Sequence, residues 1–440
     1  MLQQAQNAPR SSRFGPELRR LRMARGFTLG GLSALVHYSK SQLSKVERGL
    51  KAPSSDLARL CDNALKAEGA LISLVPPARS ASAPAPAPAP APEHCAATEA
   101  EESEFWLMQF DPTGSAWLRP VARRSVMAAG AAGAMALGMP AAPAQGHTPG
   151  FLSQARSLFD TYRAMGQTSA PGLVLPALVA QTHALRTLAE RTEPPLRRDA
   201  FVLASRYAEF VGWLMQETGD DRAALWWTDL AVRTARRGGD EGLAAYALVR
   251  RALVAFYAED GSTTVGLSRR AQAAEPQERI AGLAAQQEAQ GYALLGDHSA
   301  CMKALDRARA LLSQPDRSGA PVIGTTNLSD PVSMITGWCL HDLGRPQRAA
   351  EILDEQVSRL PAHALRTQAR YGVRRALAHA QAGEIEHACT LTERLLDTVD
   401  TVGSATVRTD LRRLARVLAR HPSVKSVREL DHRLTASLHM

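Results

Sequence analysis

The sequence predicts an all-α protein with a small basic N-terminal domain, a Pro/Ala-rich linker and a larger helical repeat domain. Aromatic residues make up only 5% of the chain, while Ala, Leu and Arg are abundant, and this composition favours helices over sheets. Apolar residues also recur at helical spacing through most of the second half. At 440 residues the chain is too long for one ordinary core, so we expect two or three domains.

Positive charge is concentrated at the N-terminus. Residues 1–51 hold ten Lys and Arg residues against two acidic residues, which accounts for +8 of the formal charge of +9. A localised basic segment on a nearly neutral chain favours a polyanionic partner. The five cysteines lie far apart and form no CxxC pair, so the sequence indicates neither a disulfide framework nor a zinc ribbon, and we expect reduced thiols.

Residues 14–75 are expected to form the first domain, beginning with two short helices. Pro16 can open the first helix, which runs to residue 25 and ends at Gly26. Thr28 is the expected N-cap of a second helix that extends through Val36. The apolar residues of this second helix follow helical spacing, so one of its faces is expected to be buried.

A third helix follows after the three-residue break at positions 37–39. Ser39 is its expected N-cap, Gly49 ends it, and Leu43 with Val46 forms its buried pair. A fourth helix is expected from Ser54. A short helix, a tight break and a polar-faced helix form helix-turn-helix geometry, in which the second helix of the pair enters a DNA major groove about 12 Å wide.

The polar face of the third helix carries the candidate DNA contacts. The amide of Gln42 can pair with adenine, and Lys40 or Lys45 can donate to guanine. Residues just past the helix end are better placed for phosphate than for bases. The candidate DNA-binding residues are Lys40, Ser41, Gln42, Ser44, Lys45, Arg48 and Lys51.

Residues 14–74 resemble the phage-repressor-like (XRE, Cro/repressor) helix-turn-helix family. The stretch "YSKSQLSKVERG", followed by a proline and "LARLCDNAL", carries the resemblance. The resemblance implies that the polar face of the third helix reads bases and that Glu47 is structural. The chain departs from the family at Leu29, where the family often has a glutamine that donates to a phosphate.

Residues 76–104 are expected to form a Pro/Ala-rich linker, and residues 105–148 a hairpin plus an apolar connector. The run "PAPAPAPAP" cannot be helical, because each proline lacks a backbone N–H donor. Two apolar segments, 105–110 and 115–118, flank "DPTG" and predict a small β-hairpin. Such a hairpin is marginal alone, so we expect Trp106 and Trp117 to pack on another part of the protein.

The stretch 122–145, "ARRSVMAAGAAGAMALGMPAAPAQ", has the features of an export signal but follows more than a hundred residues of other sequence. Its apolar run of fourteen residues is shorter than the roughly 20 that a spanning helix needs. We therefore expect a connector that packs on the C-terminal domain. The alternative is a one-pass membrane anchor, with the nearby arginines on the cytoplasmic side.

Residues 150–440 are expected to form an array of amphipathic helices separated by glycine-containing turns. The turn glycines recur at intervals of 42, 35, 48 and 39 residues, and each is followed five positions later by a small residue. This pattern resembles a divergent tetratricopeptide (TPR-like) α-solenoid, whose concave surface suits peptides, proteins or small molecules. The turn glycines are Gly219, Gly261, Gly296, Gly344 and Gly383.

Aromatic and basic residues of this array are candidates for the concave surface, although aromatic residues in repeat proteins more often belong to the core. We leave the ligand-binding residues unassigned. Cys339 and His341 are adjacent in sequence but have no second pair of ligands, so no metal is expected there. The candidates for the concave surface are Tyr207, Trp213, Trp226, Trp227, Arg250, Tyr292 and Trp338.

The arrangement as a whole resembles actinobacterial helix-turn-helix regulators and, more distantly, peptide-sensing regulators. It implies a sequence-specific, cytoplasmic transcriptional regulator that binds an operator in double-stranded DNA as a homodimer. The C-terminal array would then sense an effector (a peptide, protein or small molecule), dimerise, or do both. The alternative is an interaction adaptor with secondary DNA binding. We expect no enzymatic activity and no cofactor, since the sequence has no phosphate loop, metal spacing or placed nucleophile–base pair.

Overall fold

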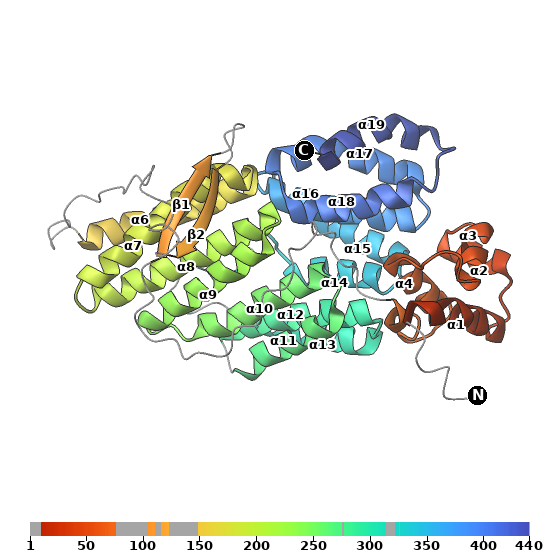
Figure 1. Cartoon of the computed structure of the whole chain (residues 1–440), viewed down its shortest axis with the longest axis horizontal. Helices are drawn as coiled ribbons and strands as arrows, with labels where there is room; N and C mark the ends of the chain where they lie inside the picture. The colour runs from red at the N-terminus through yellow and green to blue at the C-terminus, as the bar shows by residue number, and fades with distance from the viewer. Residues whose placement is uncertain are drawn as a thin grey trace.

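The structure is a computed structural model that describes residues 10–75, 104–110, 116–122, 148–274, 277–313, 322–324 and 326–439. A small helical unit, residues 10–75, lies at one end of the molecule, and a larger array of paired helices, residues 148–439, makes up most of the rest (Figure 1). The predicted all-α organisation, a helix-turn-helix unit followed by a helical repeat region, is confirmed.

Helices α2 and α3 begin after the predicted N-caps Thr28 and Ser39, and Ser54, the predicted start of the fourth helix, is the N-cap of α4. The side-chain hydroxyls of Thr28, Ser39 and Ser54 each accept a hydrogen bond from the backbone N–H three residues later. Leu43 and Val46 are buried, as predicted. The elements of this unit are α1 (Arg10–Ala24), α2 (Leu29–Val36), α3 (Lys40–Glu47), α4 (Ser55–Ala64) and the 3-10 helix η2 (Ile72–Leu74).

The prediction that the first helix begins at Pro16 is wrong, because α1 begins at Arg10 and contains Pro16. Packing explains the difference. Phe14 is fully buried, and a Cβ on Gly15 would lie only 2.4 Å from the carbonyl oxygen of Val46 in α3. This close approach holds the backbone before the proline in helical conformation, so tertiary contact outweighs the local preference for ending a helix there.

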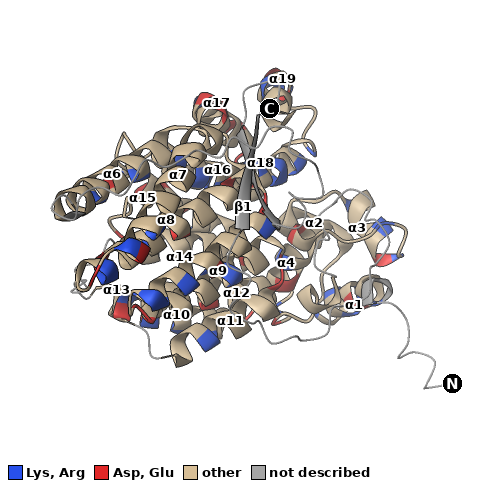
Figure 2. Ribbon diagram, turned by 60° about the vertical axis from the view of Figure 1, so that its left-hand side comes forward, with Lys and Arg blue, Asp and Glu red and all other residues tan. Residues whose placement is uncertain are grey.

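Helix α3 lies on the side of the N-terminal unit that faces away from the array. In both ribbon views α3 is at the outer side of this unit, and α4 lies nearer to the array (Figures 1 and 2). Figure 2 also shows basic residues at the outer end formed by α3 and the turn after it. The unit therefore presents α3 outward, while α4, the α2–α3 turn and the segment around Gly69 contact the array.

A two-stranded antiparallel hairpin follows, formed by β1 (Glu104–Phe110) and β2 (Ala116–Ala122), with Met108 opposite Leu118. The predicted hairpin is confirmed, but its second strand runs four residues beyond the predicted end at residue 118. β2 lies against helix α7 of the array, and this contact supports a hairpin that would be marginal alone. The side chains of Trp106 and Trp117, the linker up to residue 103 and the apolar run at 126–139 lie outside the described residues.

The helical array consists of consecutive helices that pack against their neighbours in sequence. It then curves back on itself, so that α16 and α17 contact α6, and α18 contacts α8. The helices are α6 (Thr148–Thr168), α7 (Pro171–Arg191), α8 (Leu196–Thr218), α9 (Asp221–Arg237), α10 (Gly242–Tyr257), α11 (Gly261–Ala273), α12 (Glu278–Leu295), α13 (His298–Leu312), α14 (Pro331–Asp342), α15 (Pro346–Ser358), α16 (Leu365–Gln381), α17 (Ile385–Val402), α18 (Ala405–Leu418) and α19 (Lys425–His439).

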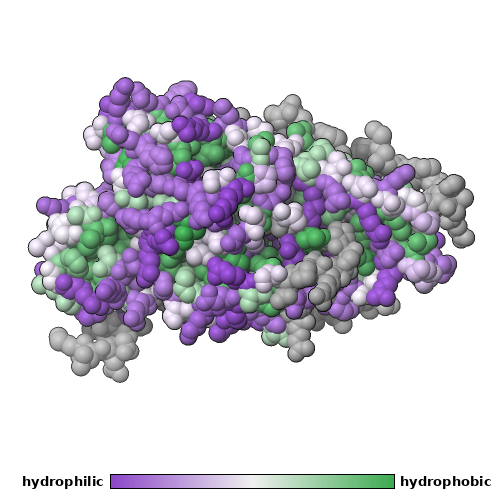
Figure 3. All heavy atoms as spheres, turned by 180° about the vertical axis from the view of Figure 1, so that it is seen from behind, coloured by the Kyte–Doolittle hydropathy of each residue, from purple (hydrophilic) through white to green (hydrophobic). Residues whose placement is uncertain are grey.

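Hydrophobic residues are mostly interior. Hydrophilic residues cover most of the face shown in Figure 3, with hydrophobic residues scattered among them. Buried apolar side chains form three successive clusters along the array and a separate one in the N-terminal unit. Each pair of helices therefore buries its apolar faces against its neighbours, as in other repeat proteins.

Four of the five predicted turn glycines take the left-handed backbone conformation that glycine favours. Gly219, Gly296, Gly344 and Gly383 lie between the two helices of a hairpin, with φ between 74° and 92°. The fifth predicted glycine, Gly261, does not occupy the left-handed position of its turn. Gly261 is the first residue of α11, and the left-handed position of that hairpin is occupied by Glu259, with φ of 57°. A glutamate there carries a backbone strain that glycine would not.

Candidate nucleic-acid interface and its contact with the helical array

Helix α3 places the predicted DNA-binding residues at one end of the molecule. Lys40, Ser41 and Lys45 are exposed, whereas Gln42 and Ser44 are half-buried. Arg48 is the C-cap residue of α3, and both it and Lys51 in the following turn are exposed. The structure therefore brings all seven residues together in α3 and the turn after it.

Glu47 has the structural role that the family resemblance implies. Its Oε1 and Oε2 accept hydrogen bonds of 2.6 and 2.9 Å from Nε and Nη2 of Arg22 in α1. Arg22 also donates to the carbonyl oxygen of Phe27, just before α2. A planar two-bond pair of this kind fixes geometry as well as charge. It ties α1 to the end of α3 and turns Glu47 away from any DNA in front of α3.

The turn between α2 and α3 is held on the side of the helical array. Tyr38 is buried, and its carbonyl oxygen accepts a 2.6 Å hydrogen bond from Ser33. The guanidinium of Arg420, which follows α18, lies 3.9 Å from the centroid of the Tyr38 ring, a cation–π contact. Burial is the largest cause that raises the pKa of Tyr38 to about 12, so the phenol stays neutral at physiological pH.

Helix α4 makes the main polar contact with the array. Arg59 is buried, and its guanidinium lies 3.5 Å from a carboxylate oxygen of Asp342 in α14 and 3.8 Å from one of Glu259. Ser55 donates a 2.6 Å hydrogen bond to Glu259. Arg413 of α18 pairs with Glu259 from the array side. Charges from the N-terminal unit and from three helical hairpins therefore meet around Glu259.

These carboxylates are held ionised by their basic neighbours. Burial would raise the pKa of Glu259, but Arg59 and Arg413 outweigh it and lower that pKa below its usual value. Burial likewise opposes ionisation of Asp342, and Arg59 and the adjacent His341 lower its pKa. Arg59 is thus the shared counter-ion of two carboxylates of the array, the buried Asp342 and the half-buried Glu259.

The N-terminal unit rests on the turns of four successive hairpins. Glu259 belongs to the α10–α11 turn, and the other three contacts are made at turn glycines. Asn63 of α4 donates a 2.9 Å hydrogen bond to the carbonyl oxygen of Gly344. A Cβ on Gly296 would lie 3.0 Å from Gly69, and one on Gly383 would lie 2.9 Å from the ring of His37. The left-handed glycines therefore allow a close approach as well as a tight turn.

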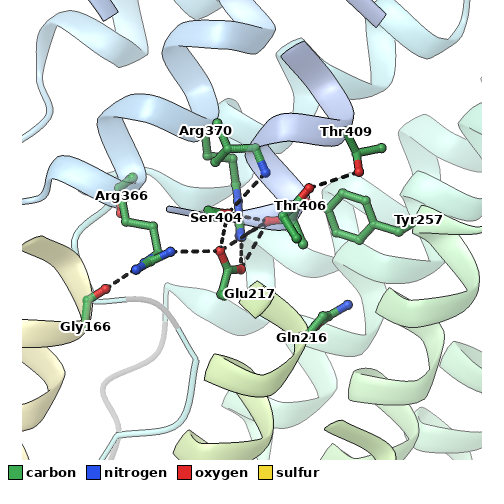
Figure 4. A network of polar contacts seen from close by, with 12 residues as sticks. Gly166, Gln216, Glu217, Tyr257, Arg366, Arg370, Ser404, Thr406 and Thr409 are labelled. Carbon is green, nitrogen blue, oxygen red and sulfur yellow. Dashed lines mark hydrogen bonds and ion pairs between the residues drawn. The ribbon is translucent and has the colours of Figure 1, made fainter. Parts of the chain in front are cut away.

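A second buried network closes the array where α16 and α18 meet α8 (Figure 4). Glu217 of α8 pairs with Arg366 and Arg370 of α16, and it accepts hydrogen bonds from Ser404 and Thr406. Burial would raise the pKa of Glu217, but the two arginines and two hydroxyls lower it to about 2. This carboxylate links the beginning of the array to its end.

The candidates for the concave surface separate into two groups. Trp213 and Arg250 line a cavity of about 460 Å³ inside the curve of the array. Tyr207, Trp227 and Trp338 are buried in the core instead. Large aromatic side chains in a repeat array bury their area between helices, which accounts for the second group. Trp226 and Tyr292 are half-buried and do not line the cavity.

The described residues form neither a metal-binding cluster nor a membrane-spanning helix. They contain no group of three or more His, Cys, Asp or Glu side chains that could hold a metal ion. His341 stacks on Trp338, with ring centroids 4.4 Å apart, and its Nδ1 lies 3.3 Å from Asp342. No described helix has the length and apolar character needed to cross a bilayer.

Glu259 and Arg59, which lie at the centre of the contact between the N-terminal unit and the array, were not predicted from the sequence. A signal for Glu259 was present: Asp220, Asp260 and Asp297 each cap the second helix of a hairpin. The residue before the aspartate is glycine in two of these hairpins, but it is Glu259 in the third. Arg59 had no comparable signal, because a single arginine on an amphipathic helix normally faces solvent.

Comparison with known proteins identifies the N-terminal unit. Residues 13–74 match a family model described as a helix-turn-helix domain. A search of curated proteins and a search of solved structures both gave no significant match. The N-terminal unit is thus a helix-turn-helix domain, which suggests a DNA-binding regulator, and the match does not extend to the helical array.

Proposed function

We propose that the chain is a sequence-specific transcriptional regulator of the XRE type, whose recognition helix is α3. The observation that carries this proposal is the orientation of the helix-turn-helix domain. Its α4 is fixed to the array through Arg59, while Lys40, Ser41 and Lys45 of α3 face outward. A helix presented in this way can enter a major groove without first separating from the rest of the molecule.

The residues of α3 divide into base-reading and phosphate-binding roles. Gln42 offers a paired amide to adenine, and Lys40 and Lys45 donate to guanine, with Ser41 and Ser44 as shorter contacts. Arg48 and Lys51 lie past the helix end, where phosphate contacts fix the register of a protein on DNA. Their basic charge supports binding to a duplex of any sequence, and the base contacts add the preference for an operator.

The array is proposed to serve as a TPR-like sensing and dimerisation domain without enzymatic activity. Its curved, closed arrangement of paired helices and its internal cavity support this role. A twofold homodimer would place two copies of α3 on half-sites about 34 Å apart. In this proposal the protein acts in the cytoplasm, like the actinobacterial regulators that it resembles.

The proposal is tested by selecting binding sites from a random DNA library. We expect the wild-type chain to enrich a palindromic site and the Lys40→Ala, Gln42→Ala double variant to lose that preference. Each well-formed base contact discriminates by about 1–3 kcal/mol, so the preference should fall at least tenfold. A matched control, Lys303→Ala with Gln347→Ala, changes exposed residues of α13 and α15 and should select the wild-type site. Unchanged selection by the α3 variant would refute the assignment.

A further inference from the structure

The cavity inside the curve of the array has the size and the walls of a small-molecule site. Its volume of about 460 Å³ falls within the range of about 300–1,000 Å³ typical of such sites. Helices α6, α8, α10, α12, α14 and α16 and the segments 322–324 and 326–328 contribute to its lining. These elements are far apart in sequence, and the curvature of the array brings them together.

One wall of the cavity is aromatic. Phe210 and Trp213 of α8 stack with ring centroids 5.2 Å apart, and Phe159 of α6 meets Phe210 edge-on at 5.8 Å. Among the described residues, six aromatic side chains line the cavity, and the whole chain has only 22 aromatic residues. In a chain so poor in aromatic residues, this concentration favours a ligand with a flat ring that can pack against these faces. The six are Phe159, Phe210, Trp213, Tyr246, Tyr257 and Tyr371.

Helix α12 contributes three glutamine side chains to the lining of the cavity. Gln286, Gln287 and Gln290 lie on α12 and line the cavity, and each has an amide atom without a hydrogen bond. Gln286 is 6% exposed and Gln290 only 2% exposed, so bulk solvent does not satisfy them. Buried polar groups in proteins are normally hydrogen-bonded. Rotation of the terminal amide would bring such an atom towards the cavity, where a polar group of a bound molecule could complete it.

The charge of the lining is positive. Five arginines line the cavity against two acidic residues, Asp160 and Glu209. Two further carboxylates, Glu217 and Asp410, pair with three of these arginines from outside the cavity, which leaves one positive charge in excess. The Nε atoms of Arg250 and Arg370 are buried and make no hydrogen bond, although Nε of Arg250 lies 3.9 Å from a carboxylate oxygen of Glu209. An anionic group in the cavity beside these two guanidinium groups would gain charge-assisted hydrogen bonds.

We propose that this cavity binds a small organic anion with a flat ring system. Arg250 and Arg370 hold the anionic group, Gln286 and Gln290 bond polar groups on the ring, and Trp213 packs against its face. This inference deepens the proposed function and rests on it, because it gives the chemical class of the effector that the array would sense.

The test uses two fluorescent probes of the same shape and different charge. Anilinonaphthalene sulfonate carries the anion, and N-phenylnaphthylamine has the same rings without it. Titrated into the full-length chain, the sulfonate is expected to bind at one site per chain, at least about tenfold more tightly than the neutral amine. Absence of saturable binding, or equal affinity for the two probes, would overturn the proposal.

Two variants of lining residues and one exposed control test whether the probes bind in this cavity. Arg370→Gln should abolish the preference for the sulfonate, whereas Arg412→Gln, an exposed position on α18, should preserve it. Gln290→Leu should weaken binding about fivefold while leaving the melting temperature unchanged or higher, because it removes an unsatisfied buried group. A purely structural glutamine would give the reverse result, lower stability with unchanged probe affinity, and would count against the proposal.

Failure of this inference can be separated from failure of the proposed function. A chain that selects DNA through α3 but does not discriminate the probes is a regulator without this ligand site. A chain that binds the sulfonate through Arg370 but shows no DNA selection has the ligand site without the proposed function. Probe titrations are therefore run on the same preparation that is used for DNA selection.

Discussion

Ser55 of α4 donates a 2.6 Å hydrogen bond to Glu259, a residue 204 positions later in the chain that lies in a left-handed hairpin turn. The equivalent position is glycine in four other hairpins of the array. A non-glycine residue in this conformation costs about 1–2 kcal/mol, so the turn accepts strain that glycine would relieve. The contacts of Glu259 with Ser55, Arg59 and Arg413 offset that strain. The glutamate is therefore best understood as part of the docking of the DNA-binding domain.

Substitution of Glu259 by glycine should separate turn stability from domain docking. The Glu259→Gly variant relieves the left-handed backbone, so we expect the array to keep its helical content. The substitution also removes the charge and the hydrogen-bond acceptor that hold α4, so the amide protons of α4 should be less protected from hydrogen exchange. We expect amide hydrogen exchange in α4 to rise about tenfold or more, corresponding to a loss of at least about 1.4 kcal/mol in local stability.

Glu259→Gln is the matched comparison, because it keeps the strained backbone and an acceptor for Ser55 but removes the charge. Its α4 exchange should lie between the wild-type and glycine values. Glu351→Gln, at an exposed position on α15, should leave exchange unchanged. Equal protection of α4 in all four proteins would show that Glu259 does not hold the domain in place.

Arg59 and Asp342 should be strongly coupled energetically. Arg59→Met leaves Asp342 and Glu259 with one fewer buried counter-ion, and the loss of one partner from a buried ion pair costs about 3–5 kcal/mol. Asp342→Asn alone should also destabilise the chain. The double variant should be less destabilised than the sum of the two single variants, because removal of both partners leaves no unpaired charge at that contact. Urea unfolding of the four proteins measures the coupling, and strict additivity would contradict this account.

Stability should fall in acid partly through Glu217. Its pKa is about 2 in the folded protein against a usual value of 4.5, so its contribution is complete above pH 4.5 and is lost as the pH falls from 4.5 towards 2. The shift corresponds to about 3 kcal/mol at neutral pH. We expect Glu217→Gln to be less stable than wild type at pH 7, with a difference that narrows below pH 4.5.

Denaturant midpoints measured between pH 7 and pH 2 check this prediction. Glu355→Gln serves as the control, because Glu355 pairs with Arg359 on the exposed surface of α15 and its substitution should leave the profile nearly unchanged. A stability difference between wild type and Glu217→Gln that stays constant across this pH range would show that Glu217 is not the titrating group.

Local patterns predicted much of the fold, because caps and apolar spacing act within a few residues. Ser39 and the buried pair Leu43 and Val46 define α3 without reference to the rest of the chain. The start of α1 was not predictable in this way, since it depends on the contact of Gly15 with α3. A helix boundary set by a neighbour in space leaves no mark in the local pattern.

The candidate sites also divide into residues that the local sequence predicts and residues that only the fold brings together. The polar face of α3 was predicted, because it consists of residues close together in the sequence. The interdomain contact joins Arg59 to Glu259 and Asp342, which lie 200 and 283 residues further along the chain. The cavity likewise needs six helices and the curvature of the array. Without relative helix positions, Trp213 could not be distinguished from core aromatic residues such as Trp338.

Arg48 and Lys51 should contribute to DNA binding through phosphates rather than bases. Removal of a phosphate contact reduces the slope of log affinity against log salt by about 0.9. The Arg48→Ala, Lys51→Ala variant should therefore lower the magnitude of the slope by about 1.8 per chain while selecting the same sequence as wild type. Arg233→Ala with Arg412→Ala, at exposed positions on α9 and α18, is the charge-matched control and should leave the slope unchanged. Altered sequence selection by the Arg48, Lys51 variant would instead assign these residues to base reading.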